Sequence, residues 1–323
     1  MKRLKVGVVG LGYLGRFHAQ KYAAMDRAEL VGLADLDLDR ARAAGQEVGA
    51  PAFGRVRDLM GRVEAVSVVV PAKDHFQVAR QMLDQGVHCL VEKPLAVSLD
   101  QADELVQLAE DKGLVLQVGH LERFNPVVTA LQQVLDRPLF FEARRLTPLI
   151  DRGRDVDVVL DLMIHDIDIL LSLLGEPPAV VESLGTAIVS AGPDAAQARL
   201  KFPSGCLASL TAARISSDPC RQIQIFQAGS HLMADCAGRS LTIFSRDRAL
   251  GRGRGQAEEV RPGVWTRRLT FPQTDPLAEE LAAFVDTVRQ GGQPLVSGRD
   301  GRRALAVALD IGARMVSEQG HGG

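Results

Sequence analysis

The chain has 323 residues, 46% of them hydrophobic, and a formal net charge of −2. This length favours two domains with separate cores, and the near-neutral charge gives no general attraction to nucleic acid or to an anionic membrane. No segment reaches the roughly 18 uncharged apolar residues that a membrane-spanning helix needs, and no signal-peptide cleavage pattern follows the basic N-terminus. We therefore expect a cytoplasmic protein with neither a nucleic-acid nor a membrane partner.

Up to about residue 120, short apolar runs alternate with longer amphipathic stretches. The runs lack regular polar alternation, which is typical of parallel strands buried on both faces. The alternation predicts an α/β fold, a doubly wound parallel sheet of the Rossmann type. The predicted strands are residues 4–10, 30–35, 64–70, 88–93 and 114–119, and the predicted helices are residues 13–25, 37–48, 75–85 and 98–112.

After residue 120 the pattern changes. A long apolar helix over 156–174 is followed by runs of period two, which predict an α+β domain with a mostly antiparallel open sheet. We therefore expect a Rossmann domain over 1–120 and a substrate-binding and oligomerisation domain over 121–323. No predicted helix remains to cover one face of this sheet, so a homodimer or homotetramer is expected. The predicted strands are 180–189, 197–202, 207–215, 222–226 and 241–244, and the closing helices are 276–289 and 299–318.

The arginine–glycine segment SRDRALGRGRG, residues 245–255, has two interpretations. Such composition occurs in RNA-binding segments, but aromatic residues for base stacking are missing nearby. A solvated loop is the preferred interpretation.

The four cysteines point to free thiols. They form no C-x-x-C pair and no evenly spaced framework, so neither disulfides nor a structural metal site is expected. They are Cys89, Cys206, Cys220 and Cys236.

A G-x-G-x-x-G motif, formed by Gly10, Gly12 and Gly15, lies between the first predicted strand and the first predicted helix. In that context the glycines allow a tight turn, and the backbone N–H groups offer a site for a pyrophosphate. Tyr13 and Leu14, inside the motif, are expected to contact the same cofactor. The alternative is a glycine turn that serves packing alone.

Asp35 ends the second predicted strand, twenty positions after Gly15. A carboxylate there can accept both ribose hydroxyls of the adenosine, which favours NAD over NADP. Arg40 complicates this choice, because an arginine can stack on adenine or reach a 2′-phosphate. NAD remains the expected cofactor.

Glu92, Lys93 and Pro94 follow the predicted strand 88–93 at its carboxyl end, where ligands bind in open α/β sheets. Proline ends the strand and directs the preceding residues toward the crevice. An ammonium group in that place can act on a substrate hydroxyl. A strand-end ion pair followed by a turn proline explains these residues equally well.

Four segments taken together are similar to the glucose–fructose oxidoreductase/inositol dehydrogenase family, often called Gfo/Idh/MocA. The segments are GLGYLG at 10–15, Val70-Pro71 with His75, VEKPL at 91–95 and DLMIHDID at 161–168. The resemblance spans nearly the whole chain.

The resemblance implies that Lys93, Asp161 and His165 form the catalytic group, with Lys93 and His165 also contacting the substrate. It further implies a cis Lys93–Pro94 bond, and it places Pro71, His75, Glu92 and Lys93 among the cofactor-binding residues.

The residues of the second motif support the same idea without deciding it. Asp161 and His165 are four positions apart, so both project from one face of a helix, with Asp168 a further turn along. Polar groups on so apolar a helix need partners. A satisfied core histidine and a metal site remain alternatives; with Lys93 and the dinucleotide motif, catalysis is favoured, because oxidising an alcohol needs a base and no metal.

The segment VGHLERFNP, residues 118–126, places Arg123 and Asn125 at the domain junction as expected substrate-binding residues, beside His120 and Glu122. This segment and the run DVDVVLDLMIHDID resemble the branch of the family that acts on nucleotide-linked amino sugars, particularly UDP-N-acetylglucosamine 3-dehydrogenases of lipid A synthesis.

The segment RRLTPLIDRGRD, residues 144–155, adds four arginines ahead of the helix, of which Arg144 is the expected substrate ligand. Guanidinium groups suit diphosphate oxygens, although solvated loop charges are the alternative for each of them. The other three are Arg145, Arg152 and Arg154.

The expected function is therefore NAD-dependent oxidation of a secondary hydroxyl, namely the 3-hydroxyl of UDP-N-acetylglucosamine. A dehydrogenase of free cyclitols or monosaccharides is the first alternative. A non-catalytic NAD(P)-binding regulator and an assembly scaffold follow; a regulator has no need for proton-transfer groups.

Overall fold

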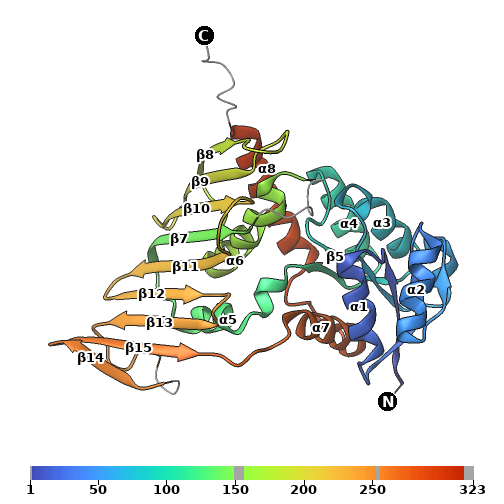
Figure 1. The fold of residues 1–323 in the computed structure, drawn as a ribbon, viewed down its shortest axis with the longest axis horizontal. Helices are drawn as coiled ribbons and strands as arrows, with labels where there is room; N and C mark the ends of the chain where they lie inside the picture. Colours follow the sequence, from blue (N-terminus) through green and yellow to red (C-terminus); the bar gives the residue numbers. More distant parts are fainter. Residues whose placement is uncertain (1, 149–155, 252–254, 316–323) are drawn as a thin grey trace, which may run out of the picture. The chain divides into compact units, whose positions relative to one another are not determined.

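The computed structural model describes residues 2–148, 156–251 and 255–315 (Figure 1). The chain divides into two compact units, one of Met1–Leu121 with Asp275–Leu305 and one of Glu122–Thr274 with Ala306–Gly323. Among the described helices, none combines the length and the apolar character needed to cross a membrane. Arg152 and Arg154 lie outside the described residues.

The first unit is built on a six-stranded sheet in the order β3-β2-β1-β4-β5-β6, and every neighbouring pair is parallel. The strand order reverses between β1 and β4, the place where such sheets bind ligands. The predicted parallel Rossmann-type sheet is thus confirmed, with the very short β3 missed. The strands are β1 (Leu4–Val9), β2 (Ala28–Ala34), β3 (Ala52–Phe53), β4 (Ala65–Val68), β5 (His88–Glu92) and β6 (Leu116–Gly119).

Four helices connect these strands, close to their predicted places. Two begin with side-chain caps: Asp37 accepts a hydrogen bond from the Arg40 N–H, and Ser98 accepts one from the Gln101 N–H. The helices are α1 (Tyr13–Ala23), α2 (Leu38–Val48), α3 (His75–Asp84) and α4 (Leu99–Asp111), with short 3₁₀ turns η1 (Val56–Leu59) and η2 (Ala72–Asp74).

Helix α7 (Pro276–Gln290) belongs to the first unit, whereas the sequence pattern placed it in the second domain. Leu281 and Phe284 are fully buried and join the core cluster of Val6 and Tyr22. Arg27 and Asp286 add an ion pair at 2.5 Å between the turn before β2 and α7. The apolar stripe of α7 predicted a core-facing helix correctly, but such a stripe does not specify which core it covers.

The second unit is built on a nine-stranded sheet in the order β14-β15-β13-β12-β11-β7-β10-β9-β8. Only the β7–β10 pair is parallel, as the predicted mostly antiparallel sheet requires. The sequence pattern missed β7, β12, β14 and β15. The strands are β7 (Pro138–Leu146), β8 (Val180–Thr186), β9 (Ala195–Lys201), β10 (Leu207–Ala213), β11 (Cys220–Gln227), β12 (Ser230–Asp235), β13 (Ser240–Ser245), β14 (Ala257–Arg261) and β15 (Val264–Thr270).

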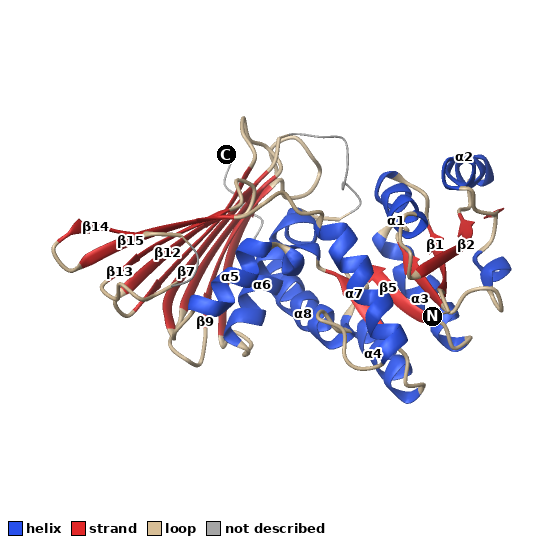
Figure 2. Ribbon diagram, turned by 90° about the horizontal axis from the view of Figure 1, so that it is seen from below, coloured by secondary structure: helices blue, strands red, loops and turns tan. Residues whose placement is uncertain are grey.

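Helices cover one face of this sheet (Figure 2). On β7, residues Phe141, Ala143 and Arg145 are buried on that face, while Arg144, on the opposite face, is exposed. The helical segments of the second unit are η3 (Leu121–Phe124, which begins one residue before it), α5 (Pro126–Val134), η4 (Val159–Met163, a single π turn), α6 (Ile164–Leu174) and the end of α8 (Gly298–Arg314).

The other face of the sheet carries a row of aromatic rings across four strands. The ring centroids of Phe140 and Phe226 lie 5.8 Å apart, those of Phe226 and His231 4.1 Å, and those of His231 and Phe244 6.2 Å. These residues are directly opposite one another in the strand pairing. No described helix lies on this side of the strands (Figure 2).

Candidate cofactor and catalytic site

The glycine turn after β1 allows close packing at two of its glycines and leaves open space at the third. Gly10 has φ +90°, and a Cβ there would lie 2.4 Å from the Val69 carbonyl oxygen. A Cβ on Gly15 would lie 1.8 Å from the Gly10 oxygen, so these two glycines allow close packing of turn, strand and helix. Gly12 differs, because a Cβ there would meet nothing within 4 Å. Gly12 therefore faces open space, which packing alone does not require.

The N-terminus of α1 is left open beside this turn. Gly12 is its N-cap residue, so no side chain caps the helix, and the first turn carries no acidic residue. The backbone N–H groups at the start of the helix then remain available to an anion, and the helix dipole favours negative charge there. The residues of the turn thus fit the pyrophosphate of a dinucleotide, held by the backbone around Gly12, Tyr13 and Leu14.

Asp35, directly after β2, is fixed by backbone donors. Its Oδ2 accepts a hydrogen bond from the Leu11 N–H at 2.7 Å, and its Oδ1 accepts one from the Asp37 N–H at 2.8 Å. The guanidinium Nη1 of Arg40 lies 3.4 Å from both carboxylate oxygens. A carboxylate fixed in this way suits the ribose hydroxyls of a bound NAD, which Asp35 would hold.

The Glu92 carboxylate, at the end of β5, is held by contacts with the Lys93 backbone and with His18. It accepts a hydrogen bond from the Lys93 backbone N–H at 3.2 Å, and its Oε1 lies 3.3 Å from the buried His18 Nε2. A Cβ on Gly119 would lie 2.8 Å from the carboxyl carbon, so a larger residue on β6 at this place would displace the carboxylate. Burial acts to raise the pKa of Glu92, but the bond and charge of His18, with Lys93 and His75, hold it below its ordinary value. The Lys93–Pro94 bond is cis, as expected.

The His75 ring contacts two backbone carbonyl oxygens close to Lys93. Its Nδ1 lies 2.7 Å from the Pro94 oxygen and its Nε2 2.8 Å from the Val70 oxygen. Both contacts are hydrogen bonds only when the ring is doubly protonated, because a neutral imidazole has one N–H. His75 and Glu92 are buried, whereas Pro71 is exposed. The two buried residues, which are also expected to bind the cofactor, contact the backbone around Lys93.

The second motif begins in the π turn η4. Asp161 lies within this turn and His165 in the first turn of α6, and both are partly exposed. The Asp161 Oδ2 lies 3.5 Å from the Nε of Arg214, whose Nη2 donates to the Val156 carbonyl. Asp168 is buried and lies 3.5 Å from the Arg123 Nη1. Asp168 lies three residues after His165 on α6, one turn along as expected, and it is the more buried of the two.

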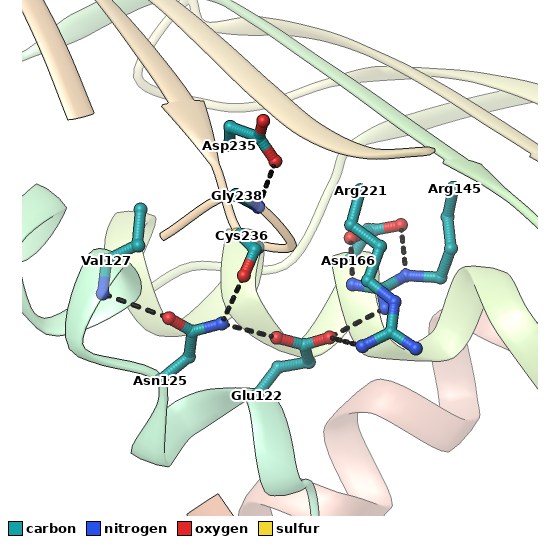
Figure 3. A network of polar contacts seen from close by, with 9 residues as sticks. All are labelled: Glu122, Asn125, Val127, Arg145, Asp166, Arg221, Asp235, Cys236 and Gly238. Carbon is teal, nitrogen blue, oxygen red and sulfur yellow. Dashed lines mark hydrogen bonds and ion pairs between the residues drawn. The ribbon is translucent and has the colours of Figure 1, made fainter. Parts of the chain in front are cut away.

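A buried polar network joins β7, η3 and α6 (Figure 3). The Arg145 Nε and Nη2 donate to the two oxygens of Asp166 at 2.9 and 2.8 Å, and its Nη1 donates to Glu122 at 2.8 Å. Arg221, directly opposite Arg145 in the strand pairing, lies 3.5 Å from Glu122. Burial acts to raise the pKa of Glu122, but the charge and hydrogen bond of Arg145 hold it below its ordinary value.

The structure gives protein contacts to two of the three expected substrate-binding residues that are neither Lys93 nor His165, and it leaves the third exposed. Both amide hydrogens of Asn125 are engaged, by Glu122 at 3.1 Å and by the Cys236 oxygen at 3.2 Å, while its oxygen caps α5 at Val127. Asn125 is thus a buried structural residue. Arg123 pairs with Asp168 inside the second unit.

Arg144, on the strand β7, lies on the sheet face opposite to Arg145 and is exposed. The helix α6, which carries His165, covers the face that holds Arg145. Arg144 and His165 are therefore on opposite sides of the sheet. Arg145 is buried, not a loop charge.

Sequence reasoning missed two groups that shape these sites. Arg214, one residue after β10, holds Asp161, and His18, inside α1, meets Glu92. His18 lies eight residues after Gly10 on the predicted helix, so its position toward the sheet was the available signal. Arg214 had none, because an arginine at the end of a strand is usually solvated. Among the described residues no cluster of three His, Cys, Asp or Glu is arranged to hold a metal ion, and all four cysteines are free thiols.

Comparison with known proteins agrees with both units. Residues 4–120 match the oxidoreductase family GFO/IDH/MocA with an NAD-binding Rossmann fold, and residues 138–230 match a C-terminal domain of that family. UDP-N-acetylglucosamine 3-dehydrogenase of Acidithiobacillus ferrooxidans is 37% identical over 312 residues, covering 96% of this chain and 97% of that protein. Myo-inositol 2-dehydrogenase of Thermotoga maritima is 28% identical, covering 94% and 93%.

The fold is shared as well. A solved structure of the Acidithiobacillus ferrooxidans UDP-N-acetylglucosamine 3-dehydrogenase has a TM-score of 0.89 and 36% identity, and the match covers 98% of each chain. The glycine turn, the Asp35 anchor and the cis Lys93–Pro94 bond occupy the Rossmann unit that the family match covers. The chain therefore belongs to the GFO/IDH/MocA family of oxidoreductases and is an NAD-binding dehydrogenase.

Proposed function

We propose that the chain oxidises the 3-hydroxyl of UDP-N-acetylglucosamine to the 3-keto sugar with NAD. The observation that carries this proposal is the 37% identity to a UDP-N-acetylglucosamine 3-dehydrogenase across nearly the full length of both proteins. The VGHLERFNP and DLMIHDID segments, which resemble the same branch, support it further.

In this proposal His165 is the general base, Lys93 the electrostatic partner of the reacting hydroxyl, and Asp161 orients or relays for the histidine. Bound NAD supplies the hydride acceptor. Histidine titrates near neutral pH and can take the hydroxyl proton, while an ammonium group stabilises the negative charge that develops on the oxygen. Glu92 and His75 would keep Lys93 in place through the contacts around its backbone.

The test compares three substrates under identical conditions. The protein is incubated with NAD and UDP-N-acetylglucosamine, free N-acetylglucosamine or myo-inositol, and NADH absorbance is followed with a keto-trapping reagent or a coupled aminotransferase present. Remote binding of the nucleotide should make the nucleotide sugar the best substrate, although the hydroxyl chemistry of the free sugar is the same.

The second candidate is a free cyclitol or monosaccharide dehydrogenase, which the 28% identity to a myo-inositol 2-dehydrogenase favours. NADH formation with inositol or the free sugar, and none with the nucleotide sugar under trapping, would replace the first proposal by this one. A protein that binds NAD but oxidises none of the three would point to a regulatory role.

A further inference from the structure

The segment that carries His165 is held by three arginine–aspartate pairs. Arg214 lies 3.5 Å from Asp161, four residues before the histidine. Two further pairs follow it: Arg145 with Asp166, one residue later, and Arg123 with Asp168, three residues later. The three arginines come from three different elements: the end of β10, the strand β7 and the turn η3. His165 therefore lies between anchors that fix the segment from several directions.

The pair of Arg145 and Asp166 is the most rigid of the three. Both residues are buried, with Arg145 3% and Asp166 4% exposed. Two parallel hydrogen bonds, at 2.9 and 2.8 Å, join guanidinium and carboxylate, so they define the relative orientation of the two planes as well as their distance. Glu122 receives the remaining Nη1 donor of the same guanidinium at 2.8 Å. Arg145 on β7 thus holds α6 at Asp166, the residue directly after His165.

The helix begins in an irregular turn. The π turn Val159–Met163 leads directly into α6, and Asp157 caps the segment by accepting hydrogen bonds from the Val159 and Leu160 N–H groups at 2.9 Å. Single π turns of this kind are rare and occur frequently at functional sites. Stability alone gives little reason for a buried ion pair here, because well-packed apolar residues of similar volume often stabilise a protein as well or better.

We propose that Arg145 is a positioning residue, which fixes the imidazole of His165 by holding the neighbouring Asp166. The proposal rests on the catalytic role of His165 proposed above. It goes beyond that role, because it assigns a function to a buried arginine of the strand β7. The competing explanation is that the network only stabilises the contact between β7 and α6.

The decisive variant is Arg145→Lys, which keeps the positive charge but cannot make two parallel bonds to Asp166. Glu122→Gln is the matched variant in the same network, because it weakens the network and leaves the Arg145–Asp166 pair in place. Arg302→Lys is the control elsewhere, since Arg302 makes the same two-bond contact with Asp103, at 2.8 and 3.0 Å, on an exposed surface. Thermal unfolding and circular dichroism give the folded fraction of each protein.

A displaced base should lower kcat without weakening cofactor binding. We expect kcat of folded Arg145→Lys to fall by roughly 10²-fold, as small misplacements of catalytic groups do, with an unchanged KM for NAD. Glu122→Gln should lose stability but retain kcat per folded molecule, and Arg302→Lys should resemble the wild type. A normal kcat in folded Arg145→Lys, or losses of kcat in both network variants that merely follow their folded fractions, would overturn the proposal.

A second readout is independent of the substrate. The ring titration of His165 is followed by NMR of ¹⁵N-histidine-labelled protein, with His165→Ala identifying the signal. The midpoint should shift in Arg145→Lys and in Asp166→Asn, and remain unchanged in Arg302→Lys. An unchanged midpoint in both network variants would sink the positioning role. If the wild type is inactive on UDP-N-acetylglucosamine, the proposed substrate fails, and this titration still decides the role of Arg145.

Discussion

The Asp35 carboxylate accepts a hydrogen bond from the Leu11 backbone N–H at 2.7 Å, so the residue after β2 directly holds the glycine turn after β1. The contact joins the two parts of the motif, since in dinucleotide-binding sheets the turn meets the pyrophosphate and the acidic residue after the second strand meets the ribose. Asp35 therefore has a fixed orientation before any cofactor binds. The Arg40 Nη1 lies 3.4 Å from its carboxylate oxygens.

This relationship predicts that NAD(H) binds more tightly than NADP(H). A 2′-phosphate would approach the fixed Asp35 carboxylate and be repelled by it. Asp35→Asn should reduce the discrimination at least several-fold, and Arg42→Gln, on the same helix as Arg40, should leave it unchanged. Dissociation constants for both cofactors by fluorescence provide the measurement. A clear NADP preference in the wild type would show that Arg40 overrides Asp35.

Lys93 and His165 should be needed for turnover but not for cofactor binding. Lys93→Met and His165→Ala are each expected to lower kcat by roughly 10²-fold or more, the range typical of general acid–base groups. Lys112→Met, which changes a surface lysine of the same unit, is the control. Steady-state kinetics with an NAD titration separate the two effects. Near-normal turnover in both site variants would make these residues structural.

The open face of the nine-stranded sheet predicts a homo-oligomer. Phe226 is 37% exposed at the centre of the aromatic row, beside the 39% exposed Met233 of β12. An uncovered apolar face of this kind usually meets a partner. Phe226→Glu should shift the protein toward monomer in sedimentation, whereas Val97→Glu, at an exposed apolar residue of the first unit, should not. A wild type that sediments as a monomer at micromolar concentration would refute the prediction.

Asp194 should contribute stability that is lost in acid. Its Oδ2 accepts hydrogen bonds from the backbone N–H groups of Ile188, Val189 and Ser190 at 2.8, 2.7 and 2.9 Å. Burial acts to raise its pKa, but these donors hold the pKa well below the ordinary value. Because the pKa is lower in the folded chain, the ionised group stabilises fully above about pH 4 and progressively less as pH falls further.

Asp194→Asn should therefore lower the free energy of unfolding at pH 7 by about 2 kcal/mol, the scale of hydrogen bonds to a charged group. The difference from the wild type should shrink below about pH 4, where the unfolded wild type takes up a proton. Urea titrations at a series of pH values measure it. A difference that stays constant down to pH 3 would contradict the assigned cause.

The Rossmann unit was predictable because its signals are local. The glycine motif between a strand and a helix, and the apolar runs of parallel strands, do not depend on distant residues. Helix α7 was misassigned because its partner, the core around Tyr22, lies more than two hundred residues away in the sequence. An apolar stripe shows that a helix packs against a core, but it does not show which core.

The arginines of the second unit were misjudged because β7 was missed. Its sequence PLFFEARRL mixes adjacent aromatic and charged residues, so it lacks the clear alternation that predicts a strand. Successive side chains of a strand point to opposite faces of the sheet, so the strand places Arg144 and Arg145 on opposite faces. Asn125 was misjudged for a related reason: its partners Glu122 and the Cys236 oxygen are brought together only by the fold.

The π turn Val159–Met163 makes the segment before His165 sensitive to chain length. A π turn contains one more residue than the α-helical turn that it interrupts, and each residue of an α-helix rotates the side chain by about 100°. Deleting a single residue, such as Leu160, would let an ordinary helix run through this region. The four-residue spacing of Asp161 and His165 would be kept, but the residues before the deletion would be rotated by about 100° relative to the helix. Val156, whose carbonyl accepts a hydrogen bond from Arg214, lies among them, so a one-residue deletion would loosen the anchoring of this segment without any substitution of the aspartate or the histidine.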